Sequence, residues 1–236
     1  MQGLIVAAGQ GLRLRAVAPS KPLAQVNGTA LIERVIDNAH AGGIDKFVVV
    51  TGYEAPRVET FLADLAGRRG LSITTVFNPD WRGANGVSVA AAAPALEARF
   101  VLMMSDHLVD PLVFRDLTRV ETGSDEVVLA VDRRLGNPLV DLDDVTRVRT
   151  DEAGRIQAIG KHLAPYDAFD IGVFLASHAL IDGVREDVAA GGVGGISEGM
   201  RRLASRGLAR VFDIGDRFWL DVDDPVAFVH AERLPA

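Results

Sequence analysis

The sequence predicts an α/β fold in which a mostly parallel, mixed central sheet is flanked by helices. Short apolar runs typical of buried strands alternate with segments whose apolar residues recur at helical spacing, and this alternation indicates βαβ units. The 236 residues are 48% hydrophobic and 24% charged, which is the composition of a globular chain with a substantial core. We therefore expect a single domain, 1–236, with two functional halves, approximately 1–135 and 136–236.

The first half alternates strands and helices from the N-terminus. The apolar run 4–8 predicts a buried strand that breaks at Gly9 and Gly11. The segment 29–41 carries apolar residues at helical spacing, with Thr29 as a candidate N-cap. The elements expected next are a strand over 47–50, a helix over 55–66, a strand over 72–77, a helix over 86–93, a strand over 100–104, a helix over 111–120 and a strand over 126–131. This order predicts parallel strands joined by helices.

The pattern changes beyond residue 132. Acidic and apolar residues alternate over 139–150, a turn is expected at 151–154, and 155–160 resembles a short strand, so we expect a meander or a hairpin. The remaining expected elements are a strand over 169–175, helices over 178–188 and 197–205, strands over 208–214 and 217–222, and a closing helix over 225–234 that starts with proline.

Composition and charge exclude several classes of protein. The formal net charge of −7 argues against binding along nucleic-acid backbones, which relies on many lysines and arginines. The chain has no cysteine, so disulfides and thiolate sites are excluded. The N-terminus lacks a basic segment before its apolar run, and the longest apolar tract, 87–104, is interrupted by a proline and two charged residues. We expect a cytoplasmic protein that neither inserts into a membrane nor binds nucleic acid.

The opening loop has the composition of a phosphate-binding site. Glycines at 9 and 11 allow several backbone N–H groups to converge on one anion, and Arg13 and Lys21 supply positive charge. A dinucleotide fingerprint would require glycine in place of Leu14, and a P-loop would require Gly-Lys-Ser/Thr. An ordinary turn with basic residues is the alternative.

Two acidic segments are candidates for a metal site. Asp106 follows an apolar strand, where a carboxylate reaches the ligand edge of the sheet and can hold Mg²⁺. Asp221 and Asp223 lie two residues apart in a strand-like run and point to the same face, so either can complete the site. A turn or cap role is the alternative for Asp106, and we interpret Asp224 as the cap of the closing helix. We interpret His107 as structural rather than as a general base.

Two further segments are candidates for substrate contacts. Asn85 and Ser88 lie in a polar loop before a helix, where they can meet a base or ribose or can form a plain turn and N-cap. Lys161 and Asp170 can together hold an anionic, hydroxylated acceptor, although lone lysines on loops are usually solvated.

The motifs AAGQGLRLR, SKPL, WRGANGVS, MMSDH, IGK, DIGVF and WLDVDDP follow in this order along essentially the whole chain. Together they resemble the motifs of nucleotidyltransferases that activate sugar and polyol phosphates. Within that superfamily the chain is most similar to the inositol-1-phosphate cytidylyltransferases, a branch that the SDH and GK elements and LAVDRR at 129–134 favour. The resemblance implies a Rossmann-like, GT-A-type fold with a smaller β-rich, acceptor-binding part.

The resemblance also implies roles for individual residues. Leu12 stands where the superfamily commonly has Thr or Ser, so one hydroxyl contact to the triphosphate is missing. The implied roles are nucleotide binding for Ala8, Gly9, Gly11, Asn85 and Ser88, catalysis for Arg13, Lys21 and Lys161, Mg²⁺ binding for Asp106 and Asp221 with Asp223 as the alternative, and acceptor binding for Lys161 and Asp170.

The implied reaction is Mg²⁺-dependent transfer of CMP from CTP to inositol 1-phosphate, giving CDP-inositol and pyrophosphate. Phosphocholine or a hexose 1-phosphate, with CTP or another nucleotide, is an alternative, although a choline site favours an aromatic cage and the chain has only two Trp and two Tyr. A non-catalytic, nucleotide-binding regulatory module is the alternative from a different class. Relatives in this branch are often fused to a membrane transferase, so we expect a separate transferase downstream, and we take a homodimer as the starting expectation.

Overall fold

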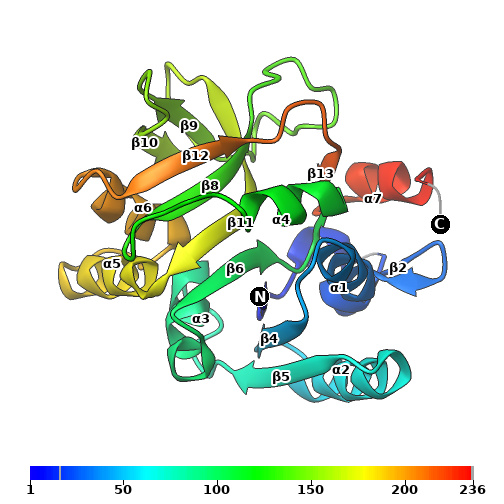
Figure 1. Ribbon diagram of the computed structural model, residues 1–236. Helices are drawn as coiled ribbons and strands as arrows, with labels where there is room; N and C mark the ends of the chain where they lie inside the picture. Colours follow the sequence, from blue (N-terminus) through cyan, green and yellow to red (C-terminus); the bar gives the residue numbers. More distant parts are fainter. Residues whose placement is uncertain (16, 235–236) are drawn as a thin grey trace.

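The computed structural model describes residues 1–15 and 17–234 and shows a mixed sheet between helices (Figure 1). Within these residues the sheet has nine strands, and its main path runs in the order β10-β9-β11-β6-β1-β4-β5. Strand β8 pairs with β11 and with β12 beside this path. The prediction of a mostly parallel, mixed sheet flanked by helices is therefore confirmed.

The first half forms the parallel part of the sheet. Strand β1 (Gln2–Ala7) lies between β4 (Lys46–Thr51) and β6 (Arg99–Met104), and β5 (Ser72–Phe77) pairs with β4 at the edge. The helices of this half are α1 (Leu31–Ala41), α2 (Ala55–Arg69), α3 (Asn85–Ala91) and α4 (Pro111–Leu117). Because these strands are parallel, their carboxyl ends meet at one edge of the sheet, where ligands of α/β proteins gather.

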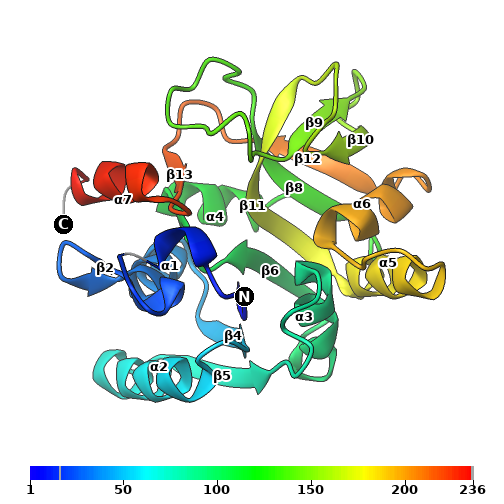
Figure 2. The same cartoon turned by 180° about the vertical axis from the view of Figure 1, so that it is seen from behind.

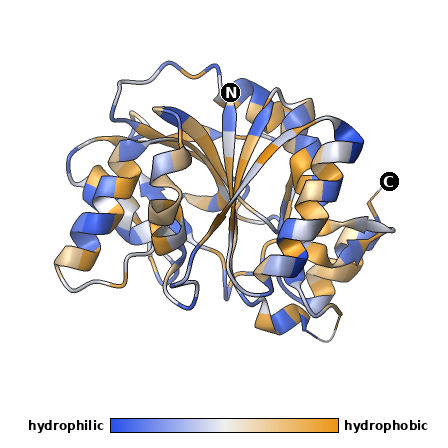
Figure 3. Ribbon diagram, turned by 90° about the horizontal axis from the view of Figure 1, so that it is seen from below, coloured by the Kyte–Doolittle hydropathy of each residue, from blue (hydrophilic) through white to orange (hydrophobic). Residues whose placement is uncertain are grey.

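Alternate residues of β1 contribute to two hydrophobic cores, one on each face of the sheet. Ile5 and Ala7 pack with α1, α2 and α4, whereas Leu4 and Val6 pack with α3, α5 (His178–Ala189) and α6 (Ile196–Ala204). The second set of helices lies in front in Figure 2, and Figure 3 shows helices on both sides of the largely hydrophobic sheet. Among the helices that the structure describes, none has the length and apolar composition needed to cross a bilayer.

The second half extends the sheet with antiparallel strands. The long strand β11 (Ala168–Ser177) runs antiparallel to β6 and to β8 (Val127–Asp132), and β12 (Ala209–Asp213) is parallel to β8. Strands β9 (Arg147–Thr150) and β10 (Ile156–Gly160) are antiparallel to each other, which confirms the predicted hairpin. Strands from both halves thus share one nine-stranded sheet, while β2 pairs with β3, and β7 with β13, in two separate two-stranded sheets. The division into two functional halves stays a prediction.

Several boundaries differ from the sequence prediction. Thr29 is not an N-cap, because it lies in β3 (Thr29–Ala30), which pairs with β2 (Gln25–Val26), and the helix begins after Ala30. Helix α4 ends three residues earlier than predicted, at Leu117. The remaining elements are the 3₁₀ turns Leu12–Leu14, Lys21–Leu23 and Ala93–Ala95, strands β7 (His107–Val109) and β13 (Trp219–Asp221), and helix α7 (Pro225–Glu232).

The sequence analysis missed β7, whose pairing with β13 matters most for the site. The two strands are antiparallel, and Asp221 lies opposite His107. This pairing brings a segment near the C-terminus to the end of β6, although their sequence positions differ by more than one hundred residues. The reason it was missed is physical: a three-residue strand has too short a pattern to be recognised before its partner is known.

Candidate active site

A cavity of about 550 Å³ opens at the carboxyl ends of β1 and β6. Its wall combines side chains from distant parts of the chain, as expected for a ligand site at this edge of an α/β sheet. The charged lining residues are Arg13 after β1, Asp106 and His107 after β6, Asp141 and Asp144 between β8 and β9, Lys161 after β10, Asp170 in β11, Asp221 and Asp223 in and after β13, and Asp224 and His230 at α7.

The opening loop packs against Lys21. Gly11 has a φ of 58°, and a Cβ at this position would overlap the Lys21 side chain, so only glycine allows the two to approach. Lys21 is only 8% exposed. The space above Gly9 is open, Ala8 is buried, and the Leu12 side chain points into solvent. Lys21 is not part of the cavity wall, but it lies directly behind that wall, where it pairs with Asp106 and Asp223, two residues that do line the cavity.

Two carboxylates face each other where β6 and β13 end. The Oδ1 atoms of Asp106 and Asp221 are buried and have no hydrogen-bond partner among the described residues. Together with the imidazole of His107 they offer ligand atoms that all lie within 4.8 Å of one another. Buried carboxylate oxygens normally have a donor or a cation, so this pair fits a divalent ion such as Mg²⁺.

His107 lies directly beside the two carboxylates. Its Nδ1 is 2.7 Å from the carbonyl oxygen of Ile171, and its Nε2 is 3.4 Å from Oδ1 of Asp221 and 3.7 Å from Oδ1 of Asp106. Burial opposes the charge on the imidazole, but the two carboxylates outweigh it and raise the pKa of His107 to about 10. Burial likewise opposes the charge of Asp221, but His107 lowers the pKa of that carboxyl to about 2. His107 thus lines the site as a cation that pairs with both carboxylates, and it would have to lose its proton before Nε2 could bind a metal ion.

Gly172 explains why this imidazole can approach β11. A Cβ at Gly172, whose φ is 74°, would overlap the ring of His107. The glycine lies where the pairing register of β11 with β8 shifts between Asp170 and Phe174. The glycine in the DIGVF motif is therefore needed for close packing at the site.

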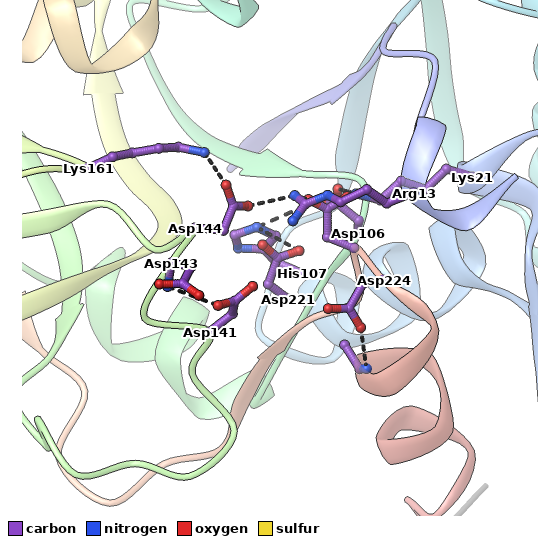
Figure 4. A network of polar contacts seen from close by, with 12 residues as sticks. Arg13, Lys21, Asp106, His107, Asp141, Asp143, Asp144, Lys161, Asp221 and Asp224 are labelled. Atoms are coloured by element: carbon purple, nitrogen blue, oxygen red, sulfur yellow. Dashed lines mark hydrogen bonds and ion pairs between the residues drawn. The ribbon is translucent and has the colours of Figure 1, made fainter.

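The three cations expected to bind phosphate are all paired with carboxylates. Lys21 contacts Asp106 and Asp223, Arg13 contacts Asp223 and Asp144, and Lys161 contacts Asp144 (Figure 4). The Arg13 Nη2 to Asp144 Oδ2 distance is 2.6 Å. Asp223, the alternative metal ligand, thus lies between Lys21 and Arg13, and it also belongs to a second acidic group with Asp144 and Asp221.

Asp144 is the main site residue that the sequence analysis missed. It lies in the segment between β8 and β9, which has no regular secondary structure, and it joins Arg13 to Lys161. Burial opposes its charge, but Lys161 and Arg13 lower the pKa of the Asp144 carboxyl below its usual value. The acidic and apolar alternation over 139–150 was the available signal, yet it indicated a strand rather than a site.

The two predicted acceptor residues both line the cavity. Lys161 follows β10, and Asp170 lies on β11, where its Oδ1 accepts a hydrogen bond of 2.7 Å from the backbone N–H of Gly172. Burial raises the pKa of Asp170 to about 6, which exceeds the opposing effects of that hydrogen bond and of His107. The cavity is therefore lined by both an ammonium group and a carboxyl group from this part of the chain.

Asn85 and Ser88 have different surroundings. Asn85 lines the cavity, and its Oδ1 accepts a hydrogen bond of 2.9 Å from the N–H of Ile196 at the start of α6. Ser88 is 3% exposed, and its Oγ accepts a hydrogen bond of 3.0 Å from Nδ2 of Asn78. The structure therefore brings Asn85 into the site but does not bring Ser88 there, because Ser88 lies on the buried side of α3.

Two aspartates near the cavity act as helix N-caps and are not among the candidate metal ligands. The carboxylate of Asp224 accepts hydrogen bonds of 2.7 and 2.8 Å from the N–H groups of Val226 and Ala227, so its cap role is confirmed. Asp110 caps α4 through the N–H of Leu112 at 2.8 Å. Asp106 therefore does not cap α4, but it does lie in a turn, the one between β6 and β7, and from there it lines the cavity.

Cations beside a carboxylate pair, at the edge of the sheet where the parallel strands β1 and β6 end, suit an enzyme that handles nucleoside phosphates. The chain belongs to the MobA-like NTP transferase domain family, whose model matches residues 3–162. It is therefore a nucleotidyltransferase-type enzyme, and the resemblance seen in its motifs is confirmed.

Two of the curated relatives share one description. A protein of Rubrobacter xylanophilus described as "Bifunctional IPC transferase and DIPP synthase" is 40% identical over 225 residues, which is 94% of this chain and 49% of that protein. A protein of Aquifex aeolicus with the same description is 29% identical over 225 residues, again 94% of this chain and 49% of that protein. The chain thus spans about half the length of these curated relatives.

Solved structures agree on the fold. The inositol-1-phosphate CTP transferase from T. maritima has a TM-score of 0.84 with 23% identity and covers 100% of this chain and 97% of its own. A UDP-glucose pyrophosphorylase complexed with UDP-glucose has a TM-score of 0.79 with 16% identity, and the match covers 98% of this chain and 96% of the pyrophosphorylase chain. At these identities the likeness establishes the nucleotidyltransferase fold.

Proposed function

We propose that this chain transfers CMP from CTP to inositol 1-phosphate, giving CDP-inositol and pyrophosphate. The observation that carries the proposal is the pair of buried carboxylate oxygens of Asp106 and Asp221, which accept no hydrogen bond from the described residues and lie near the cations Arg13, Lys21 and Lys161. The descriptions of the T. maritima neighbour and the R. xylanophilus relative support the choice of substrates.

The chemistry needs no catalytic base. A phosphate monoester is largely dianionic at neutral pH, because its second pKa is about 6, so its oxygen can attack the α-phosphorus of CTP directly. Mg²⁺ held by Asp106 and Asp221 would neutralise charge that develops on the phosphates. The protein must bring two anions together in line and stabilise the charge on departing pyrophosphate, and these are the tasks we assign to Arg13, Lys21 and Lys161.

The ion pairs of the cavity indicate how substrates enter. Arg13 and Lys161 both contact Asp144, so an arriving phosphate must replace this carboxylate as their partner. Once released, the carboxylate of Asp144 can accept hydrogen bonds from hydroxyl groups of the acceptor. The exchange preserves charge pairing while the cavity fills, which limits the cost of desolvating the cations.

The acceptor wall favours a polyol phosphate. Lys161 offers an ammonium for the phosphate, while Asp144 and Asp170 offer carboxylate oxygens for hydroxyl groups. A quaternary ammonium such as choline is best bound within an aromatic cage. Among the described residues, Phe174 and Trp219 are the two large aromatic side chains in the cavity wall, which is too few for such a cage. Recognition of hydroxyl groups therefore matches this wall better.

The decisive experiment is a matrix of four nucleoside triphosphates against inositol 1-phosphate, phosphocholine and a hexose 1-phosphate, with pyrophosphate release as the readout. We expect Mg²⁺-dependent release with CTP and inositol 1-phosphate to exceed every other combination. Preference for another pair would assign a different nucleotidyltransferase. If no combination releases pyrophosphate, the chain is a nucleotide-binding regulatory module, and equilibrium binding of CTP would measure that activity.

The relatives also suggest a cellular setting for the enzyme. The matched relatives are described as bifunctional, and this chain spans about half of their length. We propose that a membrane transferase outside residues 1–236 consumes the CDP-inositol, that the reaction described here takes place in the cytoplasm, and that the enzyme is a homodimer. Sedimentation of the purified chain tests the last of these.

A further inference from the structure

Asp132, in the LAVDRR segment, is a buried carboxylate outside the cavity wall. It ends β8 and is completely buried. Its Oδ1 accepts hydrogen bonds of 2.8 Å each from the backbone N–H and Nε of Arg134. Its Oδ2 accepts from Arg134 Nη2 at 3.0 Å, Asn137 Nδ2 at 2.9 Å and Trp219 Nε1 at 2.8 Å. Both oxygens are therefore fully used.

We propose that Asp132 is a positioning residue that sets the metal-binding strand β13 relative to the acceptor loop, defined as residues 133–146. This inference rests on the proposed function. The hydrogen bond from Trp219 fixes the start of β13, and the hydrogen bond from Asn137 fixes the acceptor loop. One buried carboxylate thus joins the two segments that carry Asp221 and Asp144.

The link to the metal site follows from strand geometry. Trp219 and Asp221 are two residues apart in β13, so their side chains point to the same face, and both line the cavity. A slip of one residue would turn both away from it. Because Asp132 holds the indole N–H, it fixes the register in which Asp221 faces Asp106.

The link to the acceptor loop is equally direct. Asn137 donates to Asp132 through Nδ2, and its Oδ1 accepts a hydrogen bond of 3.1 Å from the N–H of Leu139. Arg134 also donates from Nη2 to the carbonyl oxygen of Arg217, at 2.8 Å, just before β13. Irregular segments hold a defined shape only when such contacts fix them. The cluster therefore fixes the first part of the acceptor loop, the segment that carries Asp144.

A carboxylate is a demanding choice for this position. Burial opposes its charge, but the hydrogen bonds from Arg134, Trp219 and Asn137 outweigh it and lower the pKa of Asp132. Apolar side chains often replace buried ion pairs without loss of stability, so stability alone gives little reason for the charge. The hydrogen bonds that Arg134, Asn137 and Trp219 donate from two segments give a specific reason for the charge, since an apolar side chain could not orient these three residues.

The test compares Asp132→Asn with Glu33→Gln. The amide nitrogen of Asp132→Asn cannot accept, so at least one donor loses its partner. Glu33 is also a buried carboxylate, 7% exposed, paired with Arg68 and Arg69 of α2, and none of these three lines the cavity. The control Glu33→Gln therefore also converts a buried, paired carboxylate into an amide, but at a position that does not contact β13.

We would measure free Mn²⁺ by electron paramagnetic resonance during titration of each folded variant, and then kinetic constants at saturating Mg²⁺. For Asp132→Asn we expect the Mn²⁺ dissociation constant and the acceptor KM each to rise by about tenfold or more. We expect the CTP KM to change by less than about twofold, and Glu33→Gln to leave all three constants unchanged while lowering Tm.

Two outcomes would overturn the inference: Mn²⁺ affinity and acceptor KM that stay at their parent values, or a rise in all three constants by equal factors. If Asp132→Asn does not fold, Trp219→Phe keeps an aromatic ring and removes a single N–H, and the same expectations apply. The Mn²⁺ titration needs no turnover. An unchanged Mn²⁺ affinity therefore contradicts the role of Asp132, whereas a weakened affinity without turnover on any substrate contradicts the proposed function alone.

Discussion

The two walls of the cavity are built in different ways. The wall that we propose binds the nucleotide is built around the opening loop, which contributes Arg13 to the lining, with Lys21 buried behind it against Asp106. The acceptor wall combines a loop, a hairpin, β11 and β13, joined by the buried cluster at Asp132. The comparison shows that a phosphate-binding loop can be specified locally, whereas a site for a particular acceptor depends on contacts between distant segments.

The proposed metal site, formed by Asp106 and Asp221, lies between the two walls, so its loss should have the largest effect on the binding of both substrates. Replacing Asp106 or Asp221 with Asn removes one carboxylate of the pair, and the lost charge stabilisation of several kcal/mol should lower kcat by about 10³-fold. Pyrophosphate release under varied Mg²⁺ measures this, with circular dichroism to verify folding. The control Asp110→Ala should lose about 1 kcal/mol of stability through its α4 cap and keep its kcat. Substantial turnover in either variant of the pair would reject the assignment.

The acceptor wall should respond selectively to Lys161. Replacing it with Met removes a charged partner for phosphate, an interaction of about 1.5–3 kcal/mol, so the acceptor KM should rise by about 10- to 100-fold. Initial rates with each substrate varied in turn should show an unchanged CTP KM. The exposed Lys46, which pairs with Glu97 away from the cavity, provides the control Lys46→Met. An equal rise in both KM values would contradict the separation of the walls.

The nucleotide wall can be tested with two glycines that differ in their surroundings. Gly11→Ala places a side chain at positive φ against Lys21, so it should lose about 1–3 kcal/mol of stability and also bind CTP more weakly. Gly9→Ala meets nothing within 4 Å, so its Tm should not change. If the triphosphate lies on this backbone, the added methyl group should still raise the CTP KM by about tenfold. A normal CTP KM for Gly9→Ala would place the triphosphate elsewhere.

Asp170 should give the smallest effect, and one that depends on pH. Burial raises its pKa from 3.8 to about 6, so the folded state favours the protonated form, and the stability this provides is lost as pH rises through 6. Because the open cavity admits water, Asp170→Asn should gain about 1–2 kcal/mol of stability at pH 8 and almost none at pH 3.5. Urea unfolding at both pH values measures this. An equal gain in stability at pH 8 and pH 3.5 would show that the gain comes from packing and not from the charge of Asp170.

Local patterns predicted much of the fold. The strands and helices of the first half follow the predicted order, because alternation and helical spacing report which side chains face the cores. Thr29, by contrast, has the residue type of an N-cap but lies in a two-residue strand. Pairing with β2 decided its conformation, which shows how a tertiary contact overrides a local preference.

The site was predicted unevenly for the same reason. Asp106, Asp221, Lys161 and Asp170 were found because each lies at or near the end of an expected strand. Ser88 was expected in the site, but the phase of α3 turns it toward Asn78. Asp144 was missed because its role depends on Arg13, a residue 131 positions away.

The sequence by itself determined the α/β class, the glycine-containing loop after the first strand and the aspartates at strand ends, because these depend on periodicity and on residues adjacent in the chain. Only the tertiary structure decided that β7 pairs with β13, that Asp144 joins Arg13 to Lys161, and that Asp132 holds Trp219 across 87 positions. The physical reason is that such contacts form when separate segments pack on one sheet, and neither partner carries a local pattern that identifies the other.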